Sequence, residues 1–231
     1  HEIKTLIRER TGKRNIFRHA KREDVESVLA NLTSKDPELW AREWSRVAKP
    51  YEEQGAKLEQ AGKLTEAREA YLQAYAYYAA GRYPTPHTPG KMESFRKSLE
   101  LYERAGKFFD PPLERVNVPL GDKTTPIYVR VPKDGLKHSI VINFGGIDSF
   151  KAESYEYDEA LQRAGMASCS LDIPGVGEAP IKASPTADAL FSAVIDYLEK
   201  RPDVDPKRIG ILGRSFGGYW AAKMAYVEAE R

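Results

Sequence analysis

The chain has 231 residues, of which 41% are hydrophobic and 30% charged, and this composition excludes a wholly disordered protein. Lys and Arg number 36 against 34 Asp and Glu, and the resulting net charge of +2 argues against a nucleic-acid-binding protein, which would carry a basic stripe. The single cysteine, Cys169, excludes an internal disulfide and favours a cytoplasmic location. No apolar run reaches the roughly 18–20 residues of a membrane span, and the N-terminal residues lack the apolar core of a signal peptide, so we expect no membrane partner.

Residues 1–110 are predicted to form an all-α domain with helices over 37–61, 65–81 and 92–108. Asp36 followed by Pro37 is typical of a helix start, with Asp as the N-cap and Pro at the first helical position. Pro50 predicts a break or kink, because proline lacks the N–H that an inner helical turn needs. Gly81 is expected to end the second helix as its C-cap.

Alanine and tyrosine recur in the second predicted helix at spacings of three and four. The positions are Ala67, Ala70, Tyr71, Ala74, Tyr75 and Tyr78. Residues at this spacing share one face, so the first interpretation is a core of helix–helix packing. The alternative is that some of these aromatic side chains line a ligand cavity.

Residues 111–231 are predicted to form an α/β domain. Strands are expected over 113–120, 126–131, 139–144, 167–171 and 208–212, with helices over 153–164, 186–200 and from 219 onward. The first two strands flank Gly121-Asp122 and predict an antiparallel hairpin. The later strands alternate with helices, which favours a mostly parallel sheet with right-handed crossovers.

Gly213-Arg214-Ser215-Phe216-Gly217 lies between a predicted buried strand and a predicted helix. This context indicates a nucleophile elbow, a tight turn in which flanking glycines avoid collisions and the serine hydroxyl projects from the sheet. Ser215 is therefore the predicted nucleophile, and Arg214 beside it a candidate substrate-binding residue. The alternative interpretation is a structural glycine turn.

The segment Asn143–Ser149 (NFGGIDS) follows the predicted buried strand over 139–144. Backbone N–H groups of such a loop, together with the N–H after the nucleophile, form an oxyanion hole. We expect the amides of Phe216 and Gly146 to be the donors, with Ile147 in place of Gly146 as the alternative; a plain glycine turn is the non-catalytic interpretation. Asp148 is a candidate substrate-orienting residue, or a helix N-cap.

The order strand–FGGIDS–helix–strand–DIPGVGE–helix–strand–GRSFGG resembles the α/β-hydrolase superfamily. With its helical N-terminal region, the chain is similar to the subgroup that contains 2,6-dihydroxypseudooxynicotine hydrolase, fungal polyketide-shortening hydrolases and the fermentation-respiration switch protein. The resemblance implies an α/β-hydrolase core preceded by an all-α cap over the nucleophile. It also implies a serine hydrolase without a cofactor or metal, in a group where several members cleave a carbon–carbon bond next to a ketone.

The resemblance also implies a triad acid and a histidine after the nucleophile, and an eight-stranded sheet. All four histidines precede Ser215, and about five strands are predicted. His87, in a proline-rich loop, is a candidate base or an ordinary polar loop residue, and His138 is expected at the strand end away from the site. An elbow strand left as a hydrophobic edge invites aggregation, so we expect an incomplete core and a C-terminal segment outside these residues.

The leading functional hypothesis is therefore a serine hydrolase of a small or medium organic carbonyl compound, with carbon–carbon cleavage as one version of it. A carboxylesterase is the alternative within the same chemistry. A catalytically inactive, hydrolase-like interaction protein is the alternative outside it. The expected partners are the small-molecule substrate and the C-terminal segment, with a second copy of the chain as a further candidate.

Overall fold

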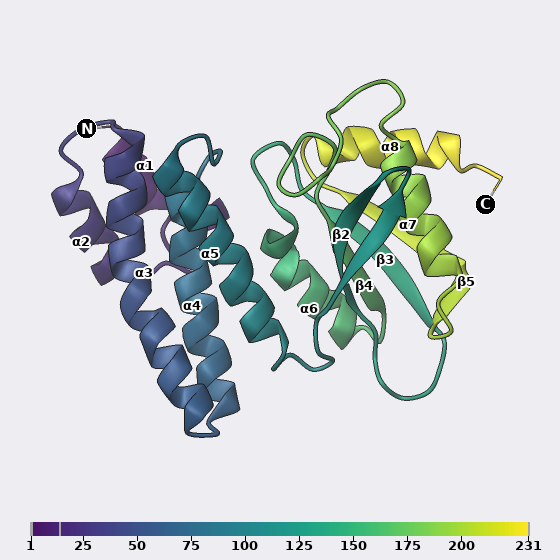
Figure 1. The fold of residues 1–231 in the computed structure, drawn as a ribbon, viewed down its shortest axis with the longest axis horizontal. Helices are drawn as coiled ribbons and strands as arrows, with labels where there is room; N and C mark the ends of the chain where they lie inside the picture. Colours follow the sequence, from purple (N-terminus) through teal and green to yellow (C-terminus); the bar gives the residue numbers. More distant parts are fainter. Residues whose placement is uncertain (1, 14, 231) are drawn as a thin grey trace. The chain divides into compact units, whose positions relative to one another are not determined.

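The computed structural model describes residues 2–13 and 15–230 (Figure 1). The chain forms two compact units, His1–Phe109 and Asp110–Arg231, and each is described by itself. The first unit is helical. Its elements are α1 (Glu2–Arg10), the 3₁₀ turn η1 (Asn15–Phe17), α2 (Arg22–Asn31), α3 (Pro37–Gln60), α4 (Leu64–Arg82) and α5 (Pro89–Gly106). In the described parts of the chain, no helix is both long enough and apolar enough to cross a membrane.

Helix α3 begins as the sequence predicts, because the Asp36 side chain accepts a hydrogen bond from the Glu38 amide at 3.0 Å and Pro37 takes the first helical position. Of the break or kink predicted at Pro50, the break is wrong. Helix α3 continues through Pro50 to Gln60 as one element. The helix contacts α4 on both sides of this proline, through Trp44 against Tyr77 before it and Gly55 against Tyr71 after it, and such packing holds a helix together across one missing backbone hydrogen bond.

The predicted C-cap at Gly81 is also wrong, because α4 extends to Arg82 and Gly81 lies inside it. A Cβ atom placed on Gly81 would lie 2.8 Å from Ser94 Oγ of α5. Glycine is therefore required here for the close approach of two helices and not for a left-handed turn.

The tyrosines of α4 are buried in the helical unit. Tyr77 stacks on Trp44 of α3 with ring centroids 6.1 Å apart, and Tyr75 contacts Tyr102 of α5 at 5.1 Å. These ring contacts support the helix-packing interpretation of the aromatic face.

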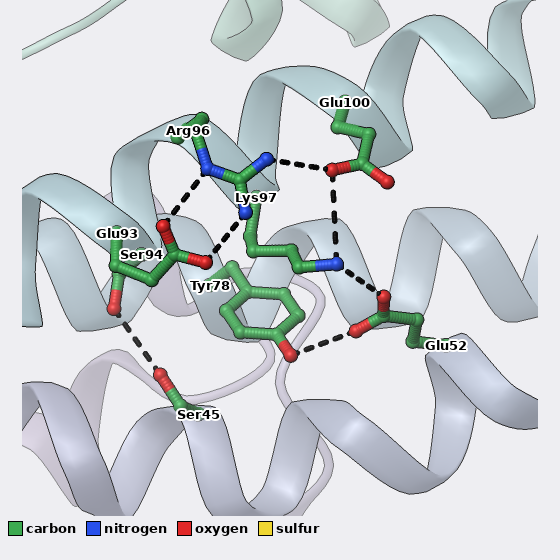
Figure 2. A network of polar contacts seen from close by, with 8 residues as sticks. All are labelled: Ser45, Glu52, Tyr78, Glu93, Ser94, Arg96, Lys97 and Glu100. Atoms are coloured by element: carbon green, nitrogen blue, oxygen red, sulfur yellow. Dashed lines mark hydrogen bonds and ion pairs between the residues drawn. The ribbon is translucent and has the colours of Figure 1, made fainter.

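Polar side chains join the three long helices at the border of this core, as Figure 2 shows. Tyr78 of α4 donates a hydrogen bond to Glu52 of α3 at 2.8 Å, and Lys97 of α5 pairs with the same carboxylate at 2.7 Å. Burial, together with the hydrogen bond to Glu52, raises the pKa of the Tyr78 hydroxyl above its ordinary value. The hydroxyl thus stays a donor at any physiological pH and contributes to the alignment of α3 with α4.

The second unit is built on a five-stranded sheet in the order β1-β2-β4-β3-β5. Its strands are β1 (Glu114–Leu120), β2 (Lys123–Arg130), β3 (His138–Phe144), β4 (Ala167–Leu171) and β5 (Val204–Gly213). The predicted β1–β2 hairpin is confirmed, β2 also pairs antiparallel with β4, and β4–β3–β5 are parallel. The α/β fold predicted for this half is thus confirmed. The sheet is mixed, with parallel strands β4, β3 and β5 and an antiparallel edge formed by the β1–β2 hairpin.

Helices of the second unit cover both faces of the sheet. They are the 3₁₀ turn η2 (Lys151–Ser154) with α6 (Tyr155–Arg163), then α7 (Ala189–Glu199) and α8 (Gly217–Val227). Figure 1 shows α6 on one face and α7 and α8 on the other. Helix α8 begins at Gly217, two residues before the predicted start, so its first turn grows directly out of the Ser215 turn.

Candidate active site

Ser215 lies at the tip of the turn between β5 and α8 and is exposed. Its φ angle of 54° places it in the left-handed region, and it is the one non-glycine residue with a positive φ in the described part of the chain. An L-residue adopts this conformation at a cost of roughly 1–2 kcal/mol. The surrounding structure therefore holds Ser215 in a strained backbone geometry, as a nucleophile elbow requires.

The glycines on either side of Ser215 are fixed by contact between backbone segments. A Cβ on Gly213 would lie 2.1 Å from the carbonyl oxygen of Gly217. A Cβ on Gly217 would lie 2.4 Å from the carbonyl oxygen of Gly145. Neither collision can be relieved by moving a flexible side chain, so both positions need glycine and the structural basis of the motif is steric.

The β3 loop brings Gly146 against the serine. A Cβ on Gly146 would lie 2.9 Å from Ser215 Oγ and 3.3 Å from the amide nitrogen of Phe216. The N–H groups of Gly146 and Phe216 donate to no acceptor within residues 2–13 and 15–230. The structure thus places together the three groups that the sequence predicts for nucleophile and oxyanion donors, and the catalytic roles themselves stay predictions. Ile147, the alternative donor, has an exposed side chain.

Asp148 lies in the same loop, half-buried. The next helical segment, η2, has Phe150 at its N-cap position, so the N-cap interpretation of Asp148 is wrong. Its role in orienting a substrate stays a prediction.

The Arg214 side chain turns inward from the elbow. Its guanidinium donates to Asn143 Oδ1 at 3.0 Å and to Ser154 Oγ at 3.1 Å, and lies 3.9 Å from the ring centroid of Tyr157. The predicted substrate-binding role of Arg214 stays a prediction, and these contacts favour a role in the scaffold of the site.

The histidine of the α/β unit lies at the opposite end of β3 from the loop that approaches Ser215. His138 opens β3, where its ring nitrogens contact Asp134 Oδ1 at 2.8 Å and the carbonyl oxygen of Gly165 at 3.1 Å. The hydrogen bond to Asp134 raises the pKa of His138. In the helical unit, His87 is exposed and contacts Thr85 of its own loop.

Sequence reasoning missed a buried ion cluster beside the oxyanion loop. Lys151, with a fully buried side chain, pairs with Asp172 Oδ2 at 2.9 Å and with Glu178, and lies 5.0 Å from the ring centroid of Tyr128. Asp172 also accepts the amides of Lys151 at 2.7 Å and Glu178 at 3.0 Å. The DIPGVGE loop is thereby fastened to the end of the loop that carries Gly146.

Burial opposes the ionisation of Glu178. The hydrogen bond from Arg115 and the charge of Lys151 outweigh it and lower the pKa of Glu178 to about 2. Within the described residues, no group of three His, Cys, Asp or Glu side chains is arranged to hold a metal ion.

The cluster leads to a stability prediction. Lys151→Met should lower the free energy of unfolding by about 3 kcal/mol, because it leaves the buried Asp172 carboxylate without its cation. Lys223→Met is the matched control, since Lys223 pairs with Asp188 at 2.6 Å but both side chains are partly exposed, and its loss should stay below about 1 kcal/mol. Urea unfolding measures both, and equal losses would contradict a structural role for the Lys151 cluster.

A mixed sheet with a strained serine between β5 and α8 and a glycine loop after β3 defines an α/β-hydrolase. The chain belongs to the FrsA-like esterase family, whose signature matches residues 13–231.

Individual relatives agree with this assignment. The chain is 31% identical over 193 residues to 2,6-dihydropseudooxynicotine hydrolase of Paenarthrobacter nicotinovorans (82% of this chain, 52% of the relative). It is 26% identical over 226 residues to the alpha/beta hydrolase UcsC of an Acremonium species (86% of this chain, 46% of the relative). The crystal structure of 2,6-dihydroxy-pseudo-oxynicotine hydrolase superposes with a TM-score of 0.80 at 25% identity, covering 98% of this chain and 61% of that one. The chain spans about half the length of the curated relatives it matches.

Proposed function

We propose that the protein carrying this chain is a serine hydrolase of a small or medium organic carbonyl compound, with Ser215 as nucleophile. The observation that carries the proposal is the positive φ of Ser215 at a glycine-flanked turn, directly against Gly146 and the Phe216 amide. Backbone strain lowers stability and is concentrated at active sites in proteins, so its presence at an exposed hydroxyl supports a catalytic role for Ser215.

In the proposed reaction, Ser215 Oγ forms a bond to the carbonyl carbon and its proton passes to a general base. The N–H groups of Phe216 and Gly146 donate to the resulting oxyanion. Collapse of the tetrahedral intermediate breaks the bond to the leaving group, which takes up the proton. Water then releases the acyl group from Ser215. In the order that the family resemblance implies, the base and its acid follow the nucleophile, and residues 216–231 contain no histidine.

The leaving group distinguishes two versions of this chemistry. An ester breaks a C–O bond and releases an alcohol. A β-diketone breaks a C–C bond and releases an enolate that is protonated to a ketone. Similarity to 2,6-dihydropseudooxynicotine hydrolase favours the C–C version, given the family resemblance, and the FrsA-like esterase family name favours a carboxylesterase.

The test is made on the full-length protein in two steps. A fluorophosphonate probe should label Ser215, and the Ser215→Ala variant should not label. The values of kcat/KM for p-nitrophenyl butyrate and for an aryl β-diketone are then compared. Preference for the diketone supports the C–C hydrolase, and preference for the ester supports the carboxylesterase. A folded protein that neither labels nor turns over either substrate would favour the inactive interaction protein and contradict the proposal.

A further inference from the structure

A buried polar cluster lies directly behind the Ser215 turn. Arg214 reaches from the end of β5 to Asn143 near the end of β3. Asn143 is fully buried, and its amide nitrogen donates to Asp158 Oδ1 of α6 at 2.6 Å and to Ser170 Oγ of β4 at 2.9 Å. Ser170 in turn donates to the Asp158 carboxylate at 2.9 Å. One connected set of hydrogen bonds therefore joins the ends of three parallel strands to α6.

The chemistry of the two ends fixes the orientation of the amide between them. A guanidinium only donates hydrogen bonds, and an ionised carboxylate only accepts them. Asn143 must therefore turn its NH₂ group toward Asp158 and its oxygen toward Arg214. The reverse orientation would leave a buried donor facing a donor and an acceptor facing an acceptor, which costs roughly 1–3 kcal/mol for each unsatisfied group.

Asp158 is itself almost completely buried, at 1% exposure. Burial raises its pKa to about 7, although the hydrogen bonds from Ser170 and Asn143 and the charge of Arg130 lower it. Arg130 of β2 and Arg214 are the cations that face this carboxyl group. The ionised form that orients Asn143 therefore predominates above neutral pH.

The Asn143–Arg214 bond connects the two backbone segments that carry the proposed chemistry. Arg214 immediately precedes Ser215, and Asn143 lies three residues before Gly146. The Arg214 amide also donates to the Phe144 carbonyl at 3.1 Å, so backbone and side chain of Arg214 both bond to β3. A shift of this side chain would change the separation between the serine hydroxyl and the oxyanion donors.

We propose that Arg214, Asn143 and Asp158 are positioning residues that hold Ser215 and Gly146 at their working separation. The inference rests on the proposed serine hydrolase activity. It assigns Arg214 to the scaffold of the site and not to substrate binding. Misplacement of reacting groups by about 1 Å can reduce a rate by about a hundredfold. Loss of a positioning residue should therefore lower kcat and leave KM nearly unchanged.

The test is a double-mutant cycle with Arg214→Met and Asn143→Leu in the full-length protein, assayed at pH 8.5. Each single variant should lower kcat by about tenfold to a hundredfold with KM within about twofold of the wild type. The double variant should be no slower than the slower single variant, because both substitutions break the same bond. Asp158→Asn keeps an acceptor oxygen for Asn143 and should retain more activity than Asp158→Leu.

The matched control is Arg201→Met, which removes another mostly buried arginine at the far end of β5. Arg201 pairs with Asp203 at 2.7 Å and Glu114 at 3.0 Å, so its loss should lower Tm and leave kcat unchanged. If Arg214→Met does not fold, Arg214→Lys is the substitute. It keeps the charge but cannot bond to Asn143 and Ser154 together as the guanidinium does, so kcat should fall by a smaller factor.

Three outcomes would overturn the inference. An unchanged kcat in folded Arg214 variants would show that the cluster does not position the serine. A raised KM with normal kcat would assign Arg214 to substrate binding. Additive losses in the cycle would show that the two side chains act separately. A wild-type protein that is inactive toward both substrates and does not label at Ser215 would instead overturn the proposed function, and the positioning role with it.

Discussion

Ser215→Ala should reduce kcat of the full-length protein by about 10⁴-fold or more, which is the scale seen when a serine hydrolase loses its nucleophile. The oxyanion donors and substrate contacts remain, so KM should change little. Steady-state turnover and fluorophosphonate labelling measure the effect. Retention of more than a few per cent of the activity would assign the nucleophile to another residue.

Ser215→Gly separates the strain of the elbow from its chemistry. Both variants lack the hydroxyl and should be inactive, but alanine keeps the φ of 54° that disfavours L-residues, whereas glycine adopts it freely. The glycine variant should therefore be more stable than the alanine variant by about 1 kcal/mol. Denaturant unfolding of the two variants checks this, and a more stable alanine variant would mean that the backbone relaxes at residue 215.

The elbow and the oxyanion loop could be predicted from sequence because their signals are local. The nearly all-apolar run before Gly145 predicts a buried strand, and Gly213 is fixed by a collision with Gly217, four residues along the chain. The need for glycine at position 217 comes instead from the carbonyl oxygen of Gly145, far away in the sequence, although the spacing of the motif already marks the residue. All five strands were predicted, because apolar runs bounded by glycine and proline are local features, but β2 begins three residues and β5 four residues before the predicted start.

The predicted helix break at Pro50 and helix end at Gly81 were wrong, because both residues lie within continuous helices. Proline and glycine are weak helix residues on their own, and the tertiary contacts of α3 with α4 and α5 decide where these helices end. Glycine is needed at position 81 because Ser94 of the next helix lies against it, and this contact cannot be predicted from the residues around Gly81.

The charged clusters of the α/β unit could not be predicted either. Lys151 has the sequence context of an ordinary surface lysine, and its partner Asp172 lies 21 residues away. Asp158 is one acid among several on an amphipathic helix, and only the placement of α6 against β3 and β4 buries it. The acidic residues of the DIPGVGE stretch were the one available signal, since Asp172 directly follows the strand predicted over 167–171 and Glu178 comes six residues later.

Gly213→Ala should cost more than about 3 kcal/mol of unfolding free energy, or prevent folding of the α/β unit. A Cβ at this position would lie 2.1 Å from Gly217 O and 2.5 Å from its carbonyl carbon, so the backbone of the first turn of α8 would have to move away from β5. Adding atoms to a well-packed core of side chains costs about 1–3 kcal/mol, and a collision with the backbone offers less room to relax.

Gly218→Ala is the matched control, one residue further into α8. The nearest atom to its added Cβ is Gly213 O at 3.9 Å, an ordinary contact, and alanine is the better helix residue by about 1 kcal/mol. This variant should thus be as stable as the wild type or more stable, and should keep its fluorophosphonate labelling. If Gly213→Ala were equally stable and labelled equally fast, β5 and α8 would be free to separate at the turn. The close approach of Gly213 to Gly217 would then not be what holds Ser215 in its strained conformation.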